Sequence, residues 1–140
     1  MLNAELGRLQ ELIENDFNLK SNPTTNMVLR AHLLNFCSFV KENPTIEYYP
    51  ISRLFEASGC STPIEVLKVT NYLTSEEVGF LTITFCYYPH GNDDVIKIAP
   101  EDYRDSIIGG IPPVDSVTGD EIEDFDQSRL GFFCYVKVLN

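Results

Sequence analysis

The sequence predicts an α+β fold, in which a three-helix core and a small antiparallel β-sheet precede a C-terminal extension that ends in a strand. Apolar residues recur at helical intervals up to about residue 74, whereas they alternate with polar residues over residues 80–88. Turn-forming residues separate these segments in the order helix, helix, short strand, two helices and hairpin.

The length of 140 residues fits a single domain that buries a sizeable core without disulfides. Hydrophobic residues make up 44% of the chain and charged residues 22%, which is typical of a globular protein. Within this domain we expect an N-terminal helix and linker (residues 1–24), a core (residues 25–98) and an acidic C-terminal extension (residues 99–140).

Two helices are predicted before residue 43. The first covers residues 3–16, where Leu6, Leu9, Leu12 and Ile13 form one narrow apolar stripe. The second covers about residues 25–42, and its wider apolar surface predicts the central core helix. Its start signal is Pro23 with Thr24 and Thr25, which supply a first-turn proline or a cap.

Residues 46–49 predict a short strand, and residues 51–58 predict a two-turn helix that Gly59 ends in a left-handed conformation. The next helix has a strong start signal. Thr62 and Glu65 form a capping box around Pro63, and helical periodicity continues to about Thr74.

Residues 80–88 predict a strand with one buried face, and the turn-rich residues 89–94 precede an antiparallel return over residues 95–98. We expect a helix from Pro100 to Gly109, then a loop and a last strand over residues 132–138. The predicted core of residues 25–98 contains Leu33, Phe36, Leu54, Phe55, Leu67, Leu73, Ile83 and Phe85.

Residues 25–98 resemble the winged helix-turn-helix superfamily in the order of their elements and in the Ser61-Thr62-Pro63-Ile64-Glu65 start of the second helix of the motif. The resemblance implies a three-helix core with a β-hairpin wing. By analogy it implies DNA binding or protein docking, because a fold does not determine a function. No functional residue is transferred from it.

The charge distribution disfavours DNA as the partner. The chain has ten basic and 21 acidic residues, a net charge of −11. Residues 91–140 hold eleven acidic and four basic residues, whereas residues 1–42 have a balance of only −1. Nucleic-acid binding draws most of its affinity from cations that neutralise phosphates, so an acidic chain starts at a disadvantage on DNA, RNA or an anionic membrane.

No residue pattern indicates catalysis, a cofactor or a metal. The four cysteines are widely spaced, and Cys37, Cys86 and Cys134 stand in apolar runs that predict buried thiols. His32 is predicted as a hydrogen-bonded core or boundary residue and His90 as a solvated turn residue. The start of the chain lacks signal-peptide features and no apolar run has the length of a membrane span, so we expect a cytoplasmic protein.

The densest anionic cluster lies in residues 120–126. Its spacing does not match an EF-hand calcium loop, which needs a central glycine and a distal glutamate. Two interpretations remain open: a solvated acidic loop held down by its two apolar residues, or a docking surface for a basic partner. The candidate partner-binding residues in it are Asp120, Glu121, Ile122, Glu123, Asp124 and Phe125.

The helix over residues 62–74 would enter the major groove if the protein read DNA. Lys68 and Asn71 share a face that could touch phosphate and base, but Glu65 shares it too and would repel the phosphate backbone. The wing turn has Asp93 and Asp94 where a DNA-binding wing usually has cations. Glu65, Lys68 and Asn71 are therefore candidate residues for docking a protein.

The sequence favours a non-enzymatic protein-interaction module, an adaptor or regulatory subunit of a larger complex. Two alternatives remain: a DNA-binding transcriptional regulator, and an acidic inhibitor or immunity-type protein whose carboxylates mimic nucleic acid. An acidic inhibitor or immunity-type protein would show a contiguous anionic face from Asp115 to Asp126 with regular carboxylate spacing. The sequence leaves the oligomeric state open.

Overall fold

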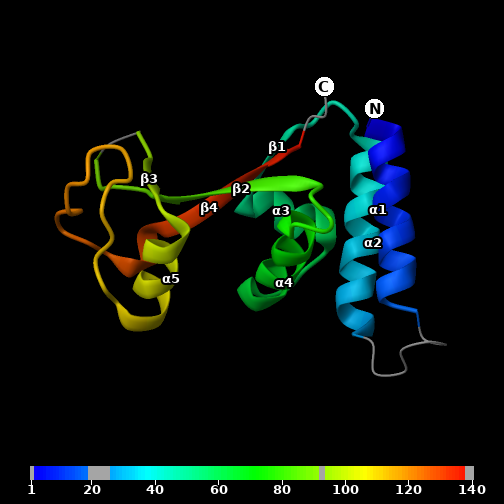
Figure 1. The fold of residues 1–140 in the computed structure, drawn as a ribbon, viewed down its shortest axis with the longest axis horizontal. Helices are drawn as coiled ribbons and strands as arrows, with labels where there is room; N and C mark the ends of the chain where they lie inside the picture. Colours follow the sequence, from blue (N-terminus) through cyan, green and yellow to red (C-terminus); the bar gives the residue numbers. More distant parts are fainter. Residues whose placement is uncertain (1, 19–25, 92–93, 138–140) are drawn as a thin grey trace. The chain divides into compact units, whose positions relative to one another are not determined.

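A computed structural model describes residues 2–18, 26–91 and 94–137. Across these ranges the chain forms five α-helices, one 3-10 turn and four strands that belong to one antiparallel sheet, which confirms the predicted α+β class. Figure 1 labels the helices and strands and colours them from blue at the N-terminus to red at the C-terminus.

The chain divides into two compact units. Unit 1 comprises residues 1–82 with residues 134–140, and unit 2 comprises residues 83–133. The sequence placed boundaries after residues 24 and 98, whereas both unit boundaries fall inside strands. A strand interior has no turn residues and no change of composition, so the sequence pattern could not indicate these two boundaries.

Four helices build unit 1: α1 (Leu2–Asp16), α2 (Met27–Glu42), α3 (Ile51–Ser58) and α4 (Pro63–Thr74). α1 and α2 lie side by side, and α2 also packs on α3 and α4, as predicted for the central helix (Figure 1). Fully buried side chains of this core include Leu9, Ile13, Leu33, Phe36, Leu54 and Leu73.

The starts and ends of these helices follow local chemistry. Asn26 caps α2 by accepting a hydrogen bond from the Leu29 amide at 2.9 Å. The predicted start signal at residues 23–25 lies outside the described residues. Gly59 ends α3 with φ of +71°, a left-handed conformation that a side chain would strain, so this stop signal is confirmed.

The sheet contains β1 (Tyr48–Pro50), β2 (Leu81–Tyr87), β3 (Ile96–Ile98) and β4 (Leu130–Val136), in the order β1-β4-β2-β3. The last strand of the chain is therefore an inner strand and not an addition at an edge. Gly131, Phe132 and Cys134 of this strand are buried, which is consistent with its apolar sequence.

The predicted hairpin is confirmed by its register, in which Phe85 pairs with Ile98 and Tyr87 with Ile96 in antiparallel directions. Beside it, unit 2 contains α5 (Pro100–Gly109) and the 3-10 turn η1 (Gln127–Arg129). A small core of Tyr87, Ile98 and Ile122 holds this unit, with Ile96, Tyr103, Phe125 and Leu130 packed against it.

The core predicted for residues 25–98 was partly wrong. Leu67 is exposed, with 36% of its surface accessible, and Phe55, Ile83 and Phe85 are half-buried. The buried face of α4 is instead formed by Val66, Val69, Thr70 and Leu73. Thr70 can occupy this face because its hydroxyl donates to the Val66 carbonyl at 2.8 Å, which satisfies the polar group inside the core.

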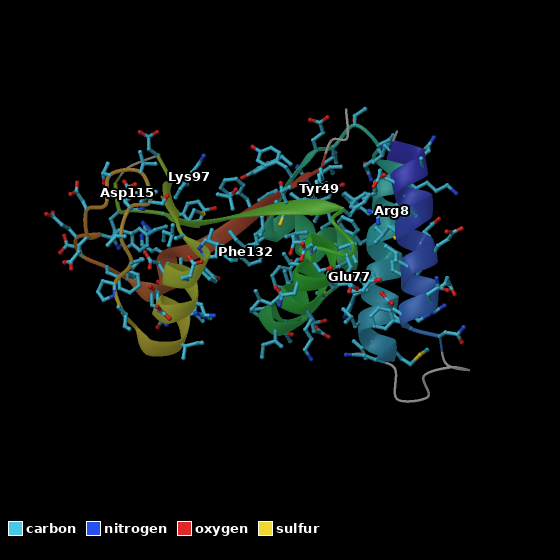
Figure 2. All side chains as sticks on the ribbon, in the orientation of Figure 1. Arg8, Tyr49, Glu77, Lys97, Asp115 and Phe132 are labelled. Atoms are coloured by element: carbon cyan, nitrogen blue, oxygen red, sulfur yellow. The ribbon has the colours of Figure 1, made fainter. Side chains whose placement is uncertain are left out.

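Tyr49 of β1 is fully buried in unit 1, where its ring packs on Phe36 at a centroid distance of 5.5 Å and on Phe39 at 6.3 Å. Figure 2 labels this side chain. Its hydroxyl has no hydrogen-bond partner among the described residues, and burial raises the pKa of the phenol. A buried hydroxyl without a partner lowers stability, since it has lost its hydrogen bonds to water.

Candidate functional site

The first turn of α4 is built as predicted. The Thr62 hydroxyl accepts from the Glu65 amide at 3.3 Å, and the Glu65 carboxylate accepts from the Thr62 amide at 3.1 Å. Glu65 also accepts from the Ser61 amide at 2.9 Å. This capping box fixes the start of the helix, and one carboxylate oxygen of Glu65 is hydrogen-bonded to backbone amides.

The other carboxylate oxygen of Glu65 lies 3.2 Å from His32 Nε2. The hydrogen bond from the Ser61 amide and the contact with His32 lower the pKa of Glu65. Nδ1 of His32 faces the Ser58 carbonyl at 3.0 Å, so the ring joins α2 to the end of α3 and the start of α4. The prediction of a hydrogen-bonded boundary histidine is confirmed.

A shallow pocket of about 240 Å³ lies where α2 begins and α4 begins, with His32, Glu65 and Lys68 among its lining residues. Small-molecule sites usually enclose roughly 300 to 1,000 Å³. The pocket is below this range, and Glu65 and His32 already partner each other there. Its remaining lining residues are Asn26, Val28 and Leu29.

The outer surface of α4 exposes Ile64, Leu67, Lys68 and Asn71, which we call the α4 face. Their spacing of three and four residues places them on one side of the helix. Ile64 has 66% of its surface accessible. On α2, Met27 and Val28 are also exposed, and Val28 lines the pocket beside Lys68.

Lys68 and Asn71 are predicted from the sequence, whereas the two apolar members of the α4 face are not. Ile64 was counted only as part of the helical periodicity and Leu67 was assigned to the core. Val66 and Leu73 lie seven residues apart on the opposite side of the helix, and this spacing could have indicated that Ile64 and Leu67 face outward. Glu65 is exposed in part, but the cap and His32 engage its carboxylate.

The acidic segment of residues 120–126 belongs to unit 2. Asp120, Glu121, Glu123 and Asp124 are exposed there. Ile122 and Phe125, the two apolar candidates for partner binding, hold the segment to the core of unit 2. Ile122 is only 8% accessible and packs in the core of unit 2, and the Phe125 ring lies 5.6 Å from the Tyr87 ring.

Hydrogen bonds fix this segment at both ends. At its start the Asp120 carbonyl accepts from the Asp115 amide at 2.8 Å, and in the preceding turn the Ser116 amide donates to the Lys97 carbonyl at 2.9 Å. Figure 2 shows Lys97 on β3 and Asp115 in the loop beyond α5. At its end the Asp126 amide donates to the Tyr87 hydroxyl at 2.9 Å. Residues 115–126 form turns, and Glu121 makes an isolated β-bridge to Val114.

Asp126 caps η1, where its carboxylate accepts from the Ser128 hydroxyl at 2.7 Å and from the Ser128 amide at 3.0 Å. These bonds lower the pKa of Asp126. His90 Nε2 lies 3.7 Å from the same carboxylate and is exposed, as predicted. Unit 2 holds eleven acidic and three basic residues, a balance of −8, so most of the acidity of the chain resides there.

Three thiols are buried as predicted, and burial raises the pKa of Cys37 to about 11 and that of Cys134 to about 12. In the described part of the chain, no three His, Cys, Asp or Glu side chains gather where they could hold a metal ion. No described helix has both the length and the apolar character that a membrane crossing requires.

Comparison of the chain with protein-family models, with curated proteins and with solved structures found no match. The α+β fold is thus defined by the structure, and the resemblance to winged helices stays an inference from element order.

Proposed function

We propose that the chain is a non-enzymatic protein-interaction module, an adaptor or regulatory subunit on a winged-helix-like core. The observation that supports this most is the composition of the α4 face. Ile64 and Leu67 are exposed beside Lys68 and Asn71. Exposed aliphatic side chains on one helix face suit the apolar surface of another protein.

The alternative of a DNA-binding regulator is less well supported by the same face. Binding to phosphates needs several cations, and Lys68 is the one basic residue of α4. Glu65, in the first turn, has a lowered pKa and stays ionised near neutral pH. At the hairpin turn Asp94 stands where a DNA-binding wing usually has a cation, and Asp93 lies outside the described residues.

The chemistry of the candidate nucleophiles and bases also supports a binding role. His32 is engaged on both ring nitrogens. Burial raises the pKa values of Cys37, Cys86 and Cys134, which keeps these thiols protonated and weakly nucleophilic at neutral pH.

The experiment compares the full chain with two variants in which exposed aliphatic residues are replaced by Asn. One replaces Ile64 and Leu67 by Asn. The control replaces Val117, which is 80% exposed in unit 2 and lies outside the α4 face, by Asn. Each protein is immobilised, and partners from native lysate are captured and identified. The affinity of the main partner for each variant is then measured with purified components.

We expect the α4-face variant to bind this partner about tenfold or more weakly and the Val117→Asn variant to bind as the parent does. Generic duplex DNA should bind the parent no more tightly than about 10⁻⁴ to 10⁻⁶ M at physiological salt. Tighter duplex binding that Lys68→Ala weakens would replace this proposal with the DNA-binding alternative.

A further inference from the structure

A second apolar surface lies at the end of α5 in unit 2. Ile107, Ile108 and Ile111 are 44%, 80% and 58% accessible, and we call them the isoleucine patch. Isolated exposed aliphatic residues are common on protein surfaces, but three within five residues are not scattered. None of them belongs to the core of Tyr87, Ile98 and Ile122.

The backbone beneath the isoleucine patch is tied down by hydrogen bonds. Gly110 ends α5 with φ of +67°, and the fully buried Ser106 donates from its hydroxyl to the Ile111 carbonyl. The Gln127 side-chain amide donates to the carbonyls of Ser106 and Ile107 at 2.9 and 3.0 Å. A surface that is already ordered loses less conformational entropy when a partner binds.

The unit that contains the isoleucine patch has many more acidic than basic residues. Gln127, which contacts the end of α5, directly follows the acidic segment of residues 120–126. On α5 itself Glu101, Arg104 and Asp105 are exposed, and both Arg104 and Asp105 lie one turn before Ile108. The whole of unit 2 has a charge balance of −8. An apolar patch in a unit of this net charge is complementary to aliphatic side chains flanked by cations.

We propose that the isoleucine patch binds a cationic amphipathic segment of a partner protein. Apolar side chains of that segment cover Ile108 and Ile111, and its Lys or Arg residues face the carboxylates of the acidic segment. A second copy of the chain, a nucleic acid and an anionic membrane are all disfavoured by like charge. The inference rests on the proposed function only in that the partner is a protein, because it concerns a surface of unit 2 and not the α4 face.

The test uses the full chain and three labelled synthetic peptides of about 14 residues: leucine and lysine at helical spacing, leucine and glutamate at the same spacing, and lysine with serine. Fluorescence anisotropy gives each Kd. The patch variant replaces Ile108 by Asn. Its matched control is Val117→Asn, since Val117 and Ile108 are equally exposed at 80% in the same unit.

We expect the leucine–lysine peptide to bind most tightly and the other two about tenfold or more weakly. The patch variant should lose about tenfold in affinity, whereas Val117→Asn should stay within about twofold of the parent. Circular dichroism confirms that each variant is folded. Raising the salt from about 0.05 to 0.5 M should weaken binding to the parent, because screening shortens the reach of the carboxylates.

Equal binding of the lysine and glutamate peptides, or unchanged binding by the folded patch variant, would overturn the inference. Binding to neutral phosphatidylcholine vesicles that Ile108→Asn abolishes would assign the patch to lipid instead. The α4-face variant should bind the leucine–lysine peptide as the parent does, so a failure here and a failure of the proposed function are separable.

Discussion

His32 Nε2 lies 3.2 Å from Glu65 Oε2, and this contact joins the middle of α2 to the first turn of α4. Because the other ring nitrogen faces the Ser58 carbonyl, both nitrogens meet hydrogen-bond acceptors. An imidazolium ring can donate to both, whereas a neutral ring can donate to one. Glu65 thus serves twice, as helix cap and as the partner of His32.

The capping box predicts the cost of losing its hydroxyl. Thr62→Ala should lower the free energy of unfolding by about 1 kcal/mol, since the Glu65 amide loses its acceptor. Chemical denaturation measures the change. Ser61→Ala is the matched control, because Ser61 contributes its backbone amide, which the substitution keeps. Equal losses in both variants would show that the side-chain cap contributes nothing.

The lowered pKa of Glu65 predicts a pH dependence. A carboxyl whose pKa is lower in the folded state stabilises the protein above its unfolded pKa, and this contribution disappears as the pH falls through the folded pKa. Glu65→Gln should therefore destabilise the protein most near neutral pH. The difference from the parent should shrink as the pH falls below the usual value of 4.5. Unfolding curves of both proteins between neutral and acidic pH test this, and a constant difference contradicts it.

Two buried tyrosines should respond in opposite directions to loss of the hydroxyl. Tyr49→Phe removes a buried hydroxyl that has no partner among the described residues and should raise the unfolding free energy by about 1 kcal/mol. Tyr87→Phe removes the acceptor of the Asp126 amide and should lower it by about 1 kcal/mol. Thermal and chemical unfolding give both values. A clear loss of unfolding free energy in Tyr49→Phe would contradict the absence of a hydrogen-bond partner for its hydroxyl among the described residues.

The corrected core predicts different costs for two apolar truncations. Phe36 is fully buried against Phe80, with ring centroids 5.9 Å apart, and Phe36→Ala should cost about 3 to 5 kcal/mol. Leu67→Ala should cost about 1 kcal/mol or less because the side chain is exposed. Similar losses of unfolding free energy in the two variants would contradict the exposed position of Leu67.

The acidic segment of unit 2 predicts an effect on association rate. Replacing Asp120, Glu121, Glu123 and Asp124 by Asn or Gln should slow binding to a captured partner more than it speeds dissociation, because charge complementarity acts mainly on encounter. Surface plasmon resonance at low and high salt measures both rates. Asp124→Asn is a suitable choice within the set, since Asp124 has φ of +52° and Asn tolerates this conformation. If the on-rate of the variant equals that of the parent at both low and high salt, the acidic segment is a solvated loop without a role in binding.

Local chemistry explains why so many elements could be predicted from the sequence alone. The capping box at Thr62 and the glycine stop at Gly59 depend on neighbouring residues only. The same holds for the hairpin of β2 and β3, whose alternation and turn residues lie within one short stretch. The α+β class, the buried cysteines and the boundary histidine followed from the same kind of pattern.

The tertiary structure decided what depends on distant residues. It placed β4 between β1 and β2, and a strand's neighbours are chosen by pairing partners far away in the chain. It turned Leu67 outward and buried Thr70, because the surface available from α2 and α3 selects the side of α4 that packs. It also buried Ile122 under the acidic segment and left Ile107, Ile108 and Ile111 exposed. All four are isoleucines in similar loops or helix ends, so their different roles come from packing, which hydrophobicity along the sequence does not encode.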